Sequence, residues 1–129
     1  MTSDTTIDTG EAPITGAVVE RVARGVAPDA SAIADALLAL NAELLGRHGS
    51  LERTADYVTV DGTRAYRIGR DEWTALLDAF EFDESMATAL RLAHTEQARL
   101  LFATAVDADD RFTSDETGVV VGIDTAEQF

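Results

Sequence analysis

The pattern of hydrophobic and polar residues in the first half of the chain predicts two amphipathic helices. From Thr15 onward, apolar residues recur at helical spacing with charged residues on the other side, and this pattern stops near Gly25 and Pro28. A longer pattern follows, which Asp29 or Ser31 can cap, because either side-chain oxygen can accept from the free N–H groups of a first helical turn. The sequence thus separates a short first helix from a long second one.

The second predicted helix has the broadest apolar face of the chain. Its stripe follows the spacing i, i+4, i+7, i+11 and consists of Ile33, Leu37, Leu40 and Leu44. We expect Gly46 or Gly49 to end this helix, and residues 50–56 to form a turn or one loose helical turn. A face this broad favours either the centre of the core or the seam of a dimer.

Residues 57–68 predict a β-hairpin. β-Branched and aromatic residues flank the two-residue loop Asp61–Gly62, which suits a type I′ turn. In the register that this loop sets, Tyr57 faces Tyr66 on the opposite strand, and Arg64 lies beside the pair. A lone hairpin is marginal in water, so one of its faces is expected to lie on the helices or to extend another sheet.

Two further helices and one strand are predicted after the hairpin. Asp71 opens a helix whose apolar residues are Trp73, Leu76, Leu77 and Phe80. Asp83 or Ser85 can cap a longer helix, in which Gln97 lies within the apolar stripe. The other members of that stripe are Met86, Leu90, Ala93, Leu100 and Leu101. Residues 118–123 could form a short strand beside the hairpin.

These elements predict a mostly helical α+β fold with about four helices. The hairpin lies between the second and third helices, and a short C-terminal strand could join it. Residues 1–13 are polar and acidic, so we expect a disordered tail there. Residues 14–123 form a single globular domain in this interpretation, and residues 124–129 form a frayed C-terminus.

The net charge indicates a salt-adapted host. The chain carries 24 Asp and Glu residues against 10 basic residues, which gives a formal net charge of −14, and every one of those basic residues is an arginine. In ordinary cytosol this much like charge opposes compaction, whereas concentrated salt screens it, with a Debye length of about 3 Å at 1 M. We therefore expect a protein built for a salt-rich cytosol.

Composition excludes several classes of function. The chain has no cysteine, which excludes disulfides, thiolate nucleophiles and Cys-ligated metals. Residues 1–11 lack the basic and apolar regions of a signal peptide, and the apolar runs are too short to cross a bilayer. We expect a cytoplasmic protein without a membrane partner. No spacing matches a catalytic, metal, nucleotide or cofactor motif, so no cofactor is predicted.

His94, Glu96 and Gln97 come nearest to a chemical cluster. Gln97 falls in the middle of an apolar stripe, and a buried amide needs hydrogen-bond partners. We expect it to bond the backbone of a neighbouring loop or a mate across an interface. His94 and Glu96 lack the i, i+4 ligand pair of helical zinc sites, and the other histidine, His48, lies at a predicted helix end. A small metal-dependent enzyme centred on His94 stays as one alternative.

The acidic stretch at residues 107–116 resembles a calcium loop in composition alone. Hard cations take several carboxylates at close spacing. The EF-hand pattern fails because Arg111 stands at its fifth position, Phe112 where glycine is needed, and Gly118 where the bidentate glutamate belongs. A solvated loop is the favoured interpretation.

Three arginines on the hairpin and its exit suggest a nucleic-acid alternative. Arg64, Arg67 and Arg70 lie near Tyr57 and Tyr66 in the predicted register. Arginine can pair with phosphate and tyrosine can stack on bases, as in a transcription-associated DNA-binding protein. Against this stand the overall charge and four nearby acidic residues that could pair with the arginines within the chain, namely Asp56, Asp61, Asp71 and Glu72.

The stretch from residue 66 to residue 99 carries a faint family signature. It combines Trp73 on one predicted helix, a Phe-Asp turn at residues 82–83, and Ala-His-x-x-Gln at residues 93–97. In these features it resembles small acidic haloarchaeal proteins of unknown function. The resemblance covers roughly the C-terminal half of the chain and implies a host range without an activity.

The favoured hypothesis is a non-enzymatic protein-interaction or regulatory module that associates with itself, as a homodimer, or with another protein. It rests on the broad apolar helix, on the amide within the last helix's stripe, and on the absence of catalytic spacing. The candidate interaction residues are Gln97, His94, Trp73, Leu37, Leu40 and Leu44.

Overall fold

The computed structural model describes residues 12–105, 112–113 and 115–122. Within these residues the chain forms an α+β fold with four helices and three strands, as predicted. The elements are α1 (Gly16–Ala23), α2 (Ala30–Thr54), β1 (Asp56–Val60), β2 (Thr63–Gly69), α3 (Arg70–Leu77), α4 (Glu84–Thr104) and β3 (Glu116–Gly122). Of the alternative caps that the sequence offered, Asp29 accepts from the N–H of Ala32 and Asp83 accepts from the N–H of Met86. The third helix begins at Arg70 and not at Asp71, and it ends at Leu77, before Phe80.

The three strands form one antiparallel sheet in the order β1-β2-β3. Asp61 and Gly62 both have positive φ, 49° and 79°, as the type I′ turn requires. Tyr57 pairs with Tyr66, which confirms the predicted hairpin register. The C-terminal strand is also confirmed, and it pairs with β2, where Val119 lies opposite Tyr66.

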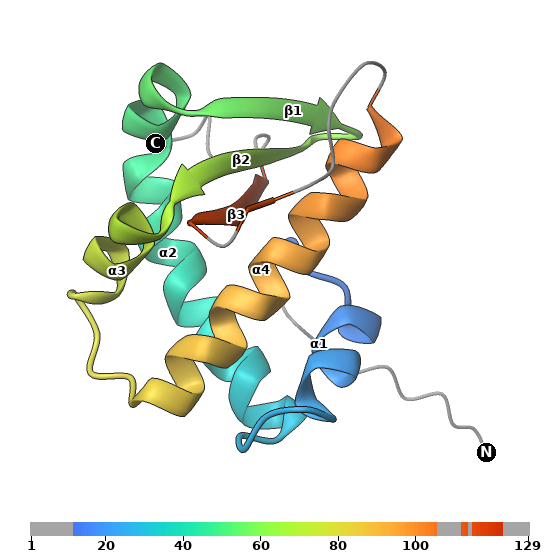
Figure 1. Ribbon diagram of the computed structural model, residues 1–129, viewed down its shortest axis with the longest axis vertical. Coiled ribbons are helices and arrows are strands. Elements are labelled where there is room, and N and C mark those ends of the chain that lie inside the picture. The colour runs from blue at the N-terminus through green and yellow to red at the C-terminus, as the bar shows by residue number, and fades with distance from the viewer. Residues whose placement is uncertain (1–11, 106–111, 114, 123–129) are drawn as a thin grey trace.

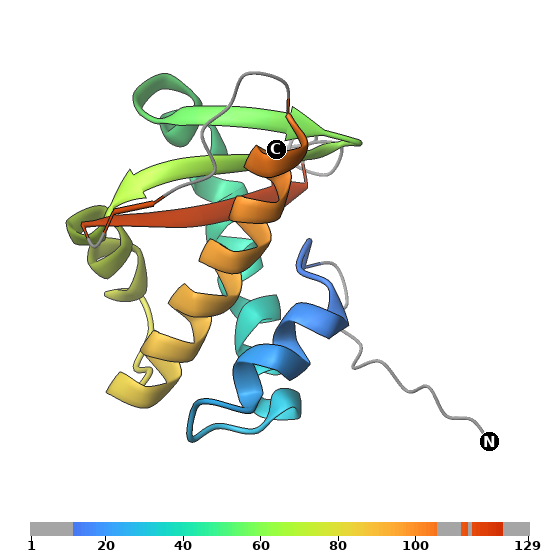
Figure 2. The same cartoon turned by 45° about the vertical axis from the view of Figure 1, so that its right-hand side comes forward.

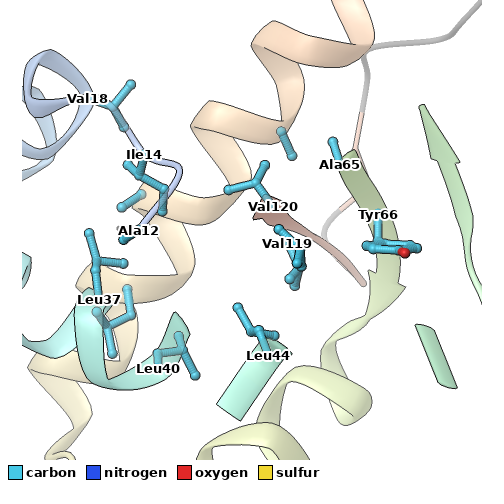
Figure 3. Close-up of a cluster of buried hydrophobic side chains, with 14 of the residues drawn as sticks. Ala12, Ile14, Val18, Leu37, Leu40, Leu44, Ala65, Tyr66, Val119 and Val120 are labelled. Carbon is cyan, nitrogen blue, oxygen red and sulfur yellow. The ribbon is translucent and has the colours of Figure 1, made fainter. Parts of the chain in front are cut away.

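The innermost strand of the molecule is β3, which lies between α2 and α4 (Figures 1 and 2). Val119, Val120 and Val121 are fully buried. Because strand side chains alternate between faces, Val119 shares the face of Tyr66, beside the leucines of α2, whereas Val120 shares the face of Ala65, toward α4 (Figure 3). One hydrophobic core therefore fills both sides of the sheet.

The closest approach of β3 to α4 occurs at Gly118. A Cβ at this position would lie 2.4 Å from the Cβ of Ala98, 3.2 Å from the Cα of Thr95 and 3.3 Å from the Cζ of Phe112. Real Cβ atoms do not approach other carbons at 2.4 Å, so the strand and the helix can pack this closely only with glycine here.

The predicted end of the second helix at Gly46 or Gly49 is wrong, since α2 continues to Thr54. Both glycines are exposed, and their cost is offset by contacts of the last two turns. Leu51 is buried there, and the Nδ1 atom of His48 lies 3.2 Å from the Tyr66 hydroxyl oxygen. The tertiary contacts of the helix therefore override the two local stop signals.

Two predicted boundaries fall at the limits of the described residues. Ala12 and Ile14 are buried, so the core includes a residue that the sequence placed in the tail. The rest of the predicted tail, the predicted frayed C-terminus and most of the acidic stretch 107–116 lie outside the described residues.

None of the described helices combines the length and the apolar character that crossing a membrane requires.

Candidate functional site

The predicted leucine and tryptophan candidates lie inside the protein. Leu37, Leu40 and Leu44 have no exposed surface, and Trp73 is only 4% exposed. The sequence left two alternatives for the broad face of α2, the centre of the core or the seam of a dimer, and the structure places these leucines at the centre of the core. These leucines therefore have no exposed surface that a partner protein could contact.

Gln97 joins α4 to the start of α1. Its Oε1 atom accepts a hydrogen bond of 3.0 Å from the backbone N–H of Thr15, the N-cap residue of α1. The amide therefore uses a backbone partner in its own chain, the first of the two alternatives that the sequence left open. This bond satisfies a polar side chain that would otherwise be buried without a partner.

His94 forms a hydrogen bond with the backbone of the sheet. Its Nδ1 atom accepts a hydrogen bond of 3.2 Å from the N–H of Val120, and its ring lies 5.7 Å from the Trp73 ring. Burial lowers the pKa of His94 to about 3, so the imidazole is neutral. Glu96, the other member of the predicted cluster, forms an ion pair with Arg21. In the described part of the chain, no three His, Asp or Glu side chains are placed to hold a metal ion.

The outer edge of β3, here called the β3 edge, is covered by α4. The pairing of Tyr66 with Val119 directs the N–H groups of Gly118 and Val120 away from β2. The first donates to Thr95 Oγ1 at 3.2 Å and the second to His94. Two successive α4 side chains therefore occupy hydrogen-bonding positions that a further strand would need.

The outer edge of β1, here called the β1 edge, has no neighbouring strand among the residues that the structure describes. Val60 and Thr63 close a two-residue loop, so residues 56, 58 and 60 bond to β2 while the N–H and C=O groups of Tyr57 and Thr59 point outward. Within the described residues these backbone groups have no partner. Tyr57 is also among the most exposed large apolar side chains described, at 43%. An unpaired edge of this kind is a template for another strand.

A polar and aromatic cluster borders the β1 edge. The guanidinium of Arg64 lies over the Tyr57 ring at 4.2 Å, bonds to Thr59 Oγ1 and pairs with Glu52 at 2.7 Å. The rings of Tyr57 and Tyr66 are 5.5 Å apart, and burial raises the pKa of the Tyr66 hydroxyl. His48, whose Nδ1 atom lies 3.2 Å from the Tyr66 hydroxyl oxygen, was not among the predicted site residues. No local signal in the sequence shows that α2 extends far enough to bring His48 to this cluster.

The three predicted nucleic-acid arginines do not share one face. Arg64 and Arg67 differ by an odd number of residues along β2, so their side chains leave opposite faces of the sheet. Arg67 pairs with Glu116 at 3.4 Å and lies against the rings of Phe102 and Phe112. Arg70 begins α3 and donates its backbone N–H to Asp115. Tyr66 is fully buried and cannot stack on a base.

Comparison with protein families finds a match over residues 12–123. The description of the matching family names neither an activity nor a host organism. The haloarchaeal resemblance therefore stays a prediction. No curated protein and no solved structure matches the chain. By the match over these residues, the chain belongs to the family described as Domain of unknown function (DUF8048).

Proposed function

We propose that this chain is a non-enzymatic, self-associating interaction module of a salt-adapted cytosol, and that two copies pair through their β1 edges. The observation that carries the proposal is the asymmetry of the sheet. Among the described residues, the backbone groups of Tyr57 and Thr59 at the β1 edge have no partner, whereas the β3 edge is occupied by Thr95 and His94. A second copy can add only at β1, so association ends at two chains.

The β1 edge is self-complementary. In an antiparallel pairing centred on Val58, Tyr57 lies opposite Thr59 of the partner subunit, and both have their backbone groups directed at the partner. Such a pairing forms about four backbone hydrogen bonds and joins the two sheets into one. The partner in this proposal is a second copy, because its strand supplies the matching donors and acceptors in the matching order.

Charge makes this association dependent on salt. Each chain carries a formal charge of −14, so two chains repel one another unless the solvent screens them. In the proposed register Asp56 lies opposite Val60 of the partner subunit, so no carboxylate directly faces another across the pair. Screening by concentrated KCl should therefore strengthen the dimer.

The test is the mass of the protein in solution by light scattering, over a range of KCl concentrations. We expect a dimer in multimolar KCl and a growing monomer fraction as salt falls. The variant Thr59→Pro removes the outward N–H and leaves the bonds of β1 to β2 in place, so it should be a folded monomer.

Thr59→Ala is the matched control, because it also loses the hydroxyl that binds Arg64 but keeps the N–H. This variant should remain a dimer. A wild-type protein that is monomeric at every salt concentration would contradict the proposal, and so would a folded Thr59→Pro variant that dimerises as well as Thr59→Ala.

A further inference from the structure

A hollow of about 400 Å³ is lined by residues of α3, of the first half of α4 and of the segment 78–83 that connects the two helices. We call it the α3–α4 pocket. The rings of Phe80 and Phe82 in its wall are stacked 4.9 Å apart, and Trp73 and Leu77 add apolar surface. Its size is that of a site for a small organic molecule.

Arg91 in this pocket differs from the other half-buried arginines. Arg47, Arg64 and Arg67 are also half-buried, and each pairs with a glutamate. Arg91 has no ion pair or hydrogen bond with any residue that the structure describes. A partly desolvated cation without an anion is unfavourable. It is also unexpected in a chain with more than twice as many acidic as basic residues.

The charged residue that acts on Arg91 most directly is another cation. Arg70 lines the same pocket, and burial together with the positive charge of Arg70 lowers the pKa of Arg91. Asp78 and Glu84 also line the pocket, but neither forms an ion pair with Arg91. Arg91 therefore has no acidic partner among the described residues that line the pocket.

We propose that the α3–α4 pocket binds a small organic anion, a carboxylate or a phosphate monoester, with its anionic group at Arg70 and Arg91. Guanidinium groups match the planar, paired oxygens of both anions. The apolar body of the ligand lies against Phe80 and Phe82. An anion in this position would give Arg91 the partner that it lacks among the described residues.

The test uses the indole N–H signal of Trp73 in two-dimensional NMR, because Trp73 is the only tryptophan and it lines the pocket. The probes are cyclohexanecarboxylate, cyclohexyl phosphate and the neutral cyclohexanecarboxamide, titrated at constant ionic strength. We expect saturable shifts with one or both anions and none with the amide. The anion that binds more tightly identifies the class of ligand.

The variant Arg91→Gln should weaken anion binding by about tenfold to a hundredfold, which corresponds to the loss of a charged hydrogen-bonded pair. Arg99→Gln is the matched control, since Arg99 is exposed on the same helix and does not line this pocket. Equal binding by the two variants would overturn the proposal. The comparison of anion with amide needs no variant, and equal shifts from both, or no shift from either anion, would also overturn it.

Discussion

Gly118 lies where β3 crosses α4, and its replacement by alanine tests whether the close packing of these two elements limits stability. The new methyl group would lie 2.4 Å from the Cβ of Ala98, an atom fixed to the helix backbone, so no side-chain rotation relieves the contact. The strand or the helix must move instead. Overpacking of this kind costs about 1–3 kcal/mol. For a chain of this size that corresponds to a loss of about 4–12 °C in Tm.

The assay is urea unfolding followed by circular dichroism at constant high KCl, with Gly122→Ala as the control. Gly122 lies in the same strand, and apart from its chain neighbours no described residue has an atom within 4 Å of the position of a new Cβ. Neither glycine has a positive φ, so backbone strain does not separate the two variants. Gly118→Ala should unfold at clearly lower urea than Gly122→Ala.

A second substitution sharpens the comparison. Ala98→Gly alone should cost about 1 kcal/mol, because glycine is a poor helix former. In the Gly118→Ala background it should cost less, since it removes the atom that the new methyl group meets, and the coupling should be about 1 kcal/mol. Equal unfolding midpoints for Gly118→Ala and Gly122→Ala, or additive effects in the double variant, would refute the reasoning.

Two further predictions concern pH and salt. His94 has a pKa of about 3 in the folded chain against an ordinary 6.5, so between these values the unfolded chain binds a proton that the folded chain does not. The free energy of unfolding should therefore fall by about 1.4 kcal/mol for each pH unit below 6.5. In His94→Gln the free energy of unfolding should change little with pH above about 4.5, the ordinary pKa of a glutamate, below which the carboxylates also take up protons. An unchanged slope in this variant would contradict the assignment to His94. Circular dichroism should show loss of helix at low KCl and recovery at multimolar KCl, and full helix content without salt would rule out salt adaptation.

The register of the hairpin was predictable to the residue because its signals are local. A two-residue loop with positive φ at both positions sets the register of every residue in the two strands. The helix starts at Asp29 and Asp83 were predictable for the same reason, since an N-cap acts within three residues. In each case the interaction that fixes the structure joins neighbours in the sequence.

The errors and omissions come from contacts between distant residues. The end of α2 depends on the contact of His48 with Tyr66, which no local pattern contains. The sequence showed that Gln97 needs a hydrogen-bond partner, but not that the backbone of Thr15, 82 positions away, provides it. For Arg91 the sequence does carry a local signal. No acidic residue stands three or four positions before or after it, which indicates that Arg91 has no ion-pair partner on its own helix.

The position of β3 in the chain has a consequence for folding during synthesis. This strand fills the centre of the core, yet it follows every other element that the structure describes, and α3 and α4 separate it from the strand that it pairs with. Until residues 116–122 leave the ribosome, β2 has an unpaired edge of its own and the leucines of α2 lack their central packing partner. Nearly the whole domain must therefore be made before it can close, and until then the exposed leucines and the unpaired edge of β2 make the nascent chain prone to aggregation.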